Sequence, residues 1–134
     1  AVGGRQALPA RQEAAAARAV TSLQAALDQA DALGGSGRFF DAHEALEAFW
    51  MKASGAEKIL LQGLIQIAAG LHRLKLDPKK TDGAFYLLDR GMEKLTKTKS
   101  LLAPATLAAL ESELKSIRSS GKAPDTLIFG LRAA

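Results

Sequence analysis

Apolar residues recur at the spacing of an α-helix in five consecutive segments, at about 10–33, 36–53, 54–76, 81–99 and 104–120. Within each segment they fall three or four positions apart, so they form one stripe along a helix. No stretch alternates apolar and polar residues as a half-buried strand would. The pattern predicts an all-α protein, a compact antiparallel helical bundle of about five helices. We expect residues 1–134 to form a single domain, with a flexible arm at 1–9, where no periodicity is found.

Residues typical of helix ends separate these segments. Glycine and proline stop helices, proline also suits the first turn, and a serine side chain can cap it. Ser54 is followed three positions later by Glu57, which is the spacing of a capping box. The other expected borders are Gly34 and Gly35 after the first helix, Ser36 before the second, Asp77 and Pro78 after the third, and Pro104 and Gly121 around the last.

The second and third segments, residues 36–76, are predicted to form a central helical hairpin that carries polar side chains among its apolar positions. On a helical wheel of the second segment, His43 and Glu47 fall at the centre of the apolar arc. On the third segment, polar residues share one arc while leucine, isoleucine, alanine and glycine fill the rest. This polar seam consists of Lys58, Gln62, Gln66, His72 and Arg73.

An unpartnered buried carboxylate is costly, so the simplest arrangement makes the two polar groups face each other. We therefore predict a buried polar centre of His43, Glu47, Gln62, Gln66, His72 and Arg73, with Trp50 beside it in the core. Gly63 and Gly70, two turns apart on the third segment, would let another backbone approach closely.

Composition narrows the classes of function. The chain has no cysteine, which excludes disulfides, thiolate zinc sites and cysteine nucleophiles. Its net charge of +4 is spread among alternating acidic and basic residues, so we expect no nucleic-acid partner, and Lys94, Lys97 and Lys99 should form a solvated face. The longest apolar run, residues 59–71, is too short to span a membrane, and no signal peptide is recognisable, so a cytoplasmic location is expected.

The same polar residues could hold a metal ion. His43 and Glu47 are one helical turn apart, and His72 from the facing helix would complete a set of two imidazoles and a carboxylate suited to zinc, iron or manganese. Glu44 would then act as general base. However, the motif reads HEALE and lacks the second histidine of the HExxH helix of zinc proteases. A satisfied hydrogen-bond network and a pocket for an unknown small molecule remain as alternatives.

Two long motifs, FFDAHEALEAFW and LLQGLIQIAAGLHRL, followed by Gly83-Ala84, resemble the hallmark of domain-of-unknown-function family 309, small bacterial and archaeal helical proteins. The resemblance covers about residues 36–95. Members of this family are catalogued as predicted metal-dependent hydrolases, a prediction made from their histidine and glutamate residues. The family pattern falls on His43, Glu44, Glu47, Trp50, Gln62, Gln66 and His72.

Two classes of function follow. The polar centre favours a structural network in a non-catalytic, self-associating helical module, and the resemblance implies a metal-dependent hydrolase as the alternative. The tail, residues 122–134, carries Leu127, Ile128 and Phe129, which could dock on the bundle or on a second subunit. If this cluster is exposed, a homodimer would cover it.

Overall fold

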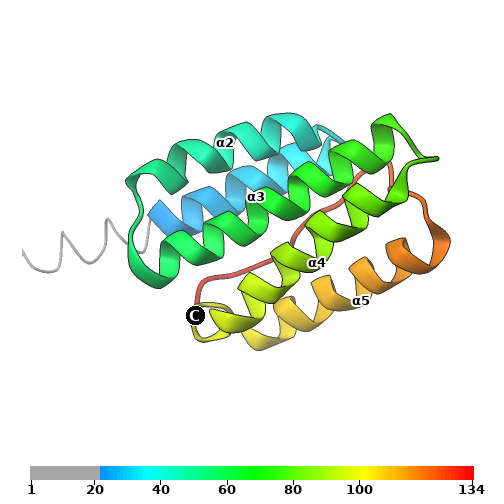
Figure 1. The fold of residues 1–134 in the computed structure, drawn as a ribbon. Coiled ribbons are helices and arrows are strands. Elements are labelled where there is room, and N and C mark those ends of the chain that lie inside the picture. Colours follow the sequence, from blue (N-terminus) through cyan, green and yellow to red (C-terminus); the bar gives the residue numbers. More distant parts are fainter. Residues whose placement is uncertain (1–21) are drawn as a thin grey trace, which may run out of the picture.

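The computed structural model describes residues 22–134, and within this range the chain is a helical bundle (Figure 1). Residues 22–35 are helical. They are followed by α2 (Phe39–Lys52), α3 (Gly55–Leu76), α4 (Thr81–Lys97), the short 3-10 helix η2 (Lys99–Leu101) and α5 (Pro104–Ser120). Residues 22–134 form no β-strand, only an isolated bridge between Leu102 and Ala133, so the predicted all-α class is confirmed. The arm at 1–9 and the first half of the first predicted helix lie outside the described residues.

Three helices form one layer, with α3 between α2 and α4 (Figure 1). The inner side of α3 carries Leu60, Leu64 and Leu71, which are fully buried. The helix of residues 22–35 and the C-terminal tail lie behind this layer in the view of Figure 1, and α5 lies beside α4. No helix among residues 22–134 is long and apolar enough to cross a membrane.

Helices α3 and α4 approach closely at two glycine positions. A Cβ atom on Gly63 would lie 2.8 Å from the carbonyl oxygen of Gly91, and a Cβ atom on Gly70 would lie 3.0 Å from that of Ala84. Neither distance leaves room for a side chain, so these backbones can meet only because both residues lack one. The predicted close approach at Gly63 and Gly70 is therefore confirmed, and Gly91 is the residue that meets Gly63.

The borders of the helices agree with the sequence where proline sets them and differ where serine was expected to cap. Helix α3 ends before Asp77 and Pro78, and α5 begins at Pro104. Ser36 does not cap α2, because Arg38 occupies that position and the Ser36 hydroxyl donates to the carbonyl of Ala32. Ser54 does occupy the cap position of α3, but its side chain makes no capping hydrogen bond.

The first described helix ends in a Schellman motif centred on Gly37, later than the glycine pair that was expected to end it. Gly37 has a left-handed φ of 74°. The backbone N–H of Arg38 donates to Leu33, and that of Gly37 donates to Gly34. A side chain at position 37 would strain this turn, which explains why the helix ends here.

The C-terminal tail docks on the bundle. Leu127, Phe129 and Leu131 are buried, while Ile128 between them is 64% exposed. The tail runs antiparallel to the helix of residues 22–35: the N–H of Leu127 donates to the carbonyl of Gly34, and the N–H of Ala133 donates to the side chain of Gln24. The homodimer was predicted from an exposed cluster of Leu127, Ile128 and Phe129. That premise is wrong, because the bundle already covers two of the three side chains.

Asp31 fastens the middle of the tail. Its carboxylate accepts a hydrogen bond of 2.8 Å from the N–H of Gly130. Burial raises the pKa of Asp31 above its usual value, and the N–H groups of Gly130 and Phe129 oppose this shift only in part. Beside it, Arg132 pairs with Asp28 at 2.9 Å, so charged groups hold the tail at the surface while apolar side chains hold it beneath.

Candidate functional site

The outer side of the α2–α3–α4 layer carries most of the residues that the sequence singled out. On α3, Gln62, Gln66, Ala69 and Arg73 recur at helical spacing opposite the buried leucines, and none of the four is buried. We call this outer side of the layer the open face. The open face comprises Phe40, His43, Glu44, Glu47 and Met51 of α2, Ile59, Gln62, Gln66, Ala69, His72, Arg73 and Leu76 of α3, and Tyr86, Leu87, Arg90, Lys94 and Lys97 of α4.

An aromatic and imidazole cluster spans α2 and α3 on the open face. The ring of Phe40 stacks on His43, with centroids 5.8 Å apart, and meets His72 at 5.2 Å. The structure thus brings together the two histidines that the sequence paired, but with a phenylalanine ring between them. Phe40 itself is 47% exposed.

Glu47 does not lie inside a buried centre. Its side chain is 49% exposed, and its Oε1 atom is 3.5 Å from Nδ1 of His43, whose side chain is 25% exposed. This Nδ1 atom is buried but has no hydrogen-bond partner, so the contact with Glu47 is an electrostatic one without hydrogen-bond geometry. The predicted burial of Glu47 is wrong, because the apolar residues Phe39, Ala42 and Leu46 take the inner side of α2.

The remaining members of the predicted centre are also displaced. Gln66 accepts a hydrogen bond of 2.9 Å from Nζ of Lys94. This bond joins α3 to α4, so the Gln66 side chain is not paired with a residue of α2. Arg73 is exposed, and its guanidinium lies beside Gly83 at the start of α4, so it cannot neutralise Glu47. Among the buried residues of the described chain, Thr98 is the single polar one. The predicted buried polar centre is therefore wrong, because its members lie on an open surface.

Trp50 lies at the border between the core and the open face. It is half-buried and packs against the hydrophobic core, as predicted for a core residue. The Nζ atom of Lys58 lies 4.3 Å from the centroid of its ring, so a cation–π contact covers the outer side. This contact joins the end of α2 to the start of α3.

The described chain does not assemble the metal ligands that the sequence suggested. Residues 22–134 contain no group of three or more histidine, aspartate or glutamate side chains placed to hold a metal ion. The aromatic ring of Phe40 contacts both His43 and His72, and Glu44 is exposed on α2. The residues therefore do not fit a three-ligand centre of His43, Glu47 and His72.

Replacing Glu47 should have little effect on stability. Because the side chain is half exposed, Glu47→Ala is expected to lower the free energy of unfolding by less than about 1 kcal/mol. Glu47→Gln should be closer still to the wild type. The measurement is a melting curve for wild type and both variants, each with excess zinc or manganese and again with chelator. This expectation would be contradicted if metal raised the melting temperature of the wild type but not that of Glu47→Gln. The hypothesis of a metal centre at Glu47 would then stand.

Exposed apolar side chains are the feature of this face that sequence reasoning missed. Of the six large hydrophobic side chains exposed within residues 22–134, five lie on the open face or at its edge, and Ile128 of the tail is the sixth. A signal was present in the sequence, because Phe40 and Met51 lie at one end of the apolar arc of α2, beyond Glu47, and the core takes the other end. The five are Phe40, Met51, Ile59, Leu76 and Tyr86, with exposed fractions of 46–74%.

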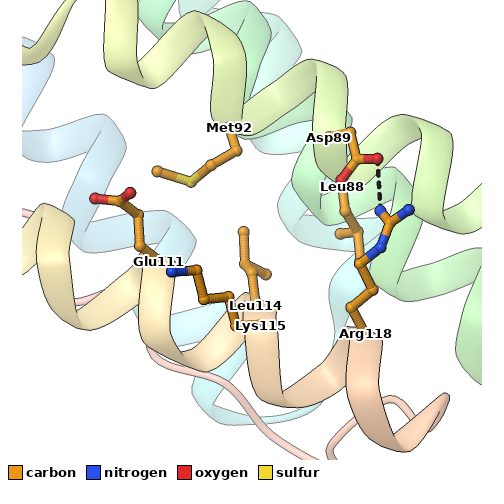
Figure 2. Close-up of a pocket in the computed structure, with 7 residues that line it drawn as sticks. All are labelled: Leu88, Asp89, Met92, Glu111, Leu114, Lys115 and Arg118. Atoms are coloured by element: carbon orange, nitrogen blue, oxygen red, sulfur yellow. Dashed lines mark hydrogen bonds and ion pairs between the residues drawn. The ribbon is translucent and has the colours of Figure 1, made fainter.

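A separate groove lies between α4 and α5 (Figure 2). Leu88 and Met92 of α4 and Leu114 of α5 form its apolar floor, and its volume is about 200 Å³. At one end Arg118 of α5 pairs with Asp89 of α4 at 2.5 Å and closes the groove (Figure 2). A cavity of this size accommodates one ring-sized apolar group, since a dry cavity of roughly 150 Å³ can hold benzene.

Residues 27–91 match the family model of the domain of unknown function DUF309, which confirms the resemblance read from the two motifs. The matched segment is just under half of the chain and contains all of α2 and α3 and the first part of α4. It thus covers most of the open face. None of the curated proteins and none of the solved structures compared with the chain matches it.

Proposed function

We propose that this protein is a non-catalytic helical module that works by binding another protein surface through its open face. The observation that carries the proposal is the gathering of five exposed large hydrophobic side chains on one side of one layer. Single exposed apolar residues are ordinary, but several on one face, interspersed with polar residues, are typical of an interaction surface. Within residues 22–134, the tail and the helix of residues 22–35 lie on the other side of the layer, and no element of this described part covers the open face (Figure 1).

The polar residues of the open face suit binding better than chemistry. Gln66 of the open face is fixed by its hydrogen bond from Lys94, and at the border of this face Trp50 is fixed by its contact with Lys58. These links hold α2, α3 and α4 in one register and therefore present a preformed surface, which lowers the entropic cost of association. Aromatic residues, such as Phe40 and Tyr86 here, are enriched at protein interfaces.

Photo-crosslinking tests whether the open face is covered in the cell. A photoreactive phenylalanine analogue is placed at Met51 or at Tyr86, both strongly exposed on the open face, in the full-length chain expressed in living cells. We expect a discrete cross-linked protein from both positions. The matched control is the same analogue at Ile128, which is equally exposed but lies on the tail, where we expect none. Absence of cross-links from both face positions, or equal cross-links from Ile128, would overturn the proposal.

A further inference from the structure

The open face is complementary in charge to itself. On its α2 edge, Glu44 and Glu47 are both exposed. Its α4 edge carries three cations, Arg90, Lys94 and Lys97, and the single carboxylate nearby, Glu93, pairs with Arg90 at 2.9 Å and reaches Lys97 only at 3.9 Å. One edge is therefore acidic and the other has an excess of positive charge, and the outward residues Gln62, Gln66 and Ala69 of α3 lie between them.

The acidic and basic groups also lie at the same height along the layer. Phe40 of α2 contacts His72 of α3, and Glu47 is two turns further along α2, about 10 Å away. On the other flank of α3, the Cβ atom of Lys94 lies next to Gly63. Since both α2 and α4 run antiparallel to α3, these contacts place Glu47 level with the turn of α4 between Arg90 and Lys94.

Two copies can pack these faces together around a two-fold axis in two simple ways. If the axis runs across the helices, α2 lies on α2 of the other copy, which brings Glu44 and Glu47 against the same carboxylates. If the axis runs along α3, α2 of each copy lies on α4 of the other. Like charges in contact cost several kcal/mol, whereas opposite charges steer and fix an interface. Charge therefore selects the axis along α3.

We propose that the partner of the open face is a second copy of this chain, packed around a two-fold axis along α3. This inference rests on the proposed function of the open face. Glu47 of each copy then faces Arg90 and Lys94 of the other. The exposed apolar side chains, Phe40 and Leu76 near one end of the face and Met51 and Ile59 near the other, are covered in the same step. The exposed guanidinium of Arg73 lies at the end of the layer, where it can turn into solvent.

A charge exchange measured by sedimentation velocity tests this pairing. The full chain is studied from low to high micromolar concentration, and we expect a reversible dimer. Glu47→Lys alone and Lys94→Glu alone should each raise the dissociation constant about tenfold or more, and the double variant should recover most of the loss. The matched control is Glu113→Lys, an exposed reversal on α5 outside the open face, which should leave the dissociation constant unchanged.

Disulfide trapping gives the second readout, and the absence of cysteine from the chain makes it specific. Met51 is level with Lys94 of the other copy in the proposed dimer, so a chain with both Met51→Cys and Lys94→Cys should form a covalent dimer on oxidation. Within one copy α3 separates the two positions. Met51→Cys alone should not cross-link, because the two α2 helices lie on opposite edges of the interface.

Three results would overturn the proposal: a monomer at every concentration, a dimer that Glu47→Lys does not weaken, or a covalent dimer from Met51→Cys alone. Failure of the double charge variant to recover association would also overturn the pairing of α2 with α4. These results are distinguishable from a failure of the proposed function. If the chain is monomeric but the open face still cross-links a different protein in cells, the module stands and the second copy is wrong.

Discussion

Phe129→Ala should lower the free energy of unfolding by about 3 to 5 kcal/mol, which is the usual cost of removing a fully buried aromatic ring. The ring is only 2% exposed and belongs to the hydrophobic core, although it lies on a tail without regular secondary structure. Its loss leaves a cavity between the tail and the helix of residues 22–35. The measurement is equilibrium unfolding in urea, with far-ultraviolet circular dichroism as the signal.

The neighbouring residue supplies the control for this prediction. Ile128 is 64% exposed, so Ile128→Ala should change the free energy of unfolding by less than about 0.5 kcal/mol. Two substitutions one position apart should thus differ roughly tenfold in their effect. If both variants unfold at the urea concentration of the wild type, the tail does not contribute to the core as the structure describes.

Gly91→Ala is expected to have the next largest effect, a loss of about 2 to 3 kcal/mol. The added Cβ atom would lie 2.5 Å from the carbonyl oxygen of Gly63 and 2.6 Å from Cγ1 of Ile67. Because the first of these is backbone, no change of rotamer relieves the overlap, and α3 and α4 must move apart. The gain in helix propensity from glycine to alanine, about 1 kcal/mol, offsets only part of this cost.

Gly83→Ala is the matched control on the same helix. There the added Cβ atom meets only the guanidinium of Arg73, at 2.9 Å, which is the far end of a flexible and exposed side chain. We expect a free energy of unfolding that is unchanged or higher by up to about 1 kcal/mol. Thermal melting of both variants decides the point. A Gly91→Ala protein as stable as Gly83→Ala would mean that the two helices do not approach at Gly63.

The ends of the helices could be predicted from the sequence where a residue is unable to continue a helix. Proline lacks the N–H that continues a helix, so Asp77-Pro78 and Pro104 mark borders in any context. Gly121 likewise closes α5 in the left-handed region, with φ of 69°. Serine gives a weaker signal, since its hydroxyl can cap a helix or bond back to a carbonyl, and Ser36 does the second.

The site could be predicted only in part. The wheel correctly grouped Gln62, Gln66 and Arg73 on one side of α3 and His43 with Glu47 on one side of α2. It could not tell which part of the apolar arc of α2 faces the core: the wheel placed His43 and Glu47 at the centre of the arc, whereas the core takes Phe39 and Leu46 at one end of it. We expected Glu47 to be buried together with polar partners, because burying a carboxylate without a partner is costly. The chain avoids the cost of burial because the Glu47 side chain is half exposed to solvent.

The sequence by itself determined the all-α class, the order of the helices and the residues that share a side of each helix, because these follow from local periodicity and from the chemistry of proline and glycine. Only the tertiary structure decided what each side faces. α3 packs against α2 on one flank, α4 on the other and the core behind. The side of α3 that carries most of the polar seam therefore faces outward. The tail likewise acquired its role from residues about a hundred positions earlier, through Asp31 and Gln24, and such long-range contacts have no local signature.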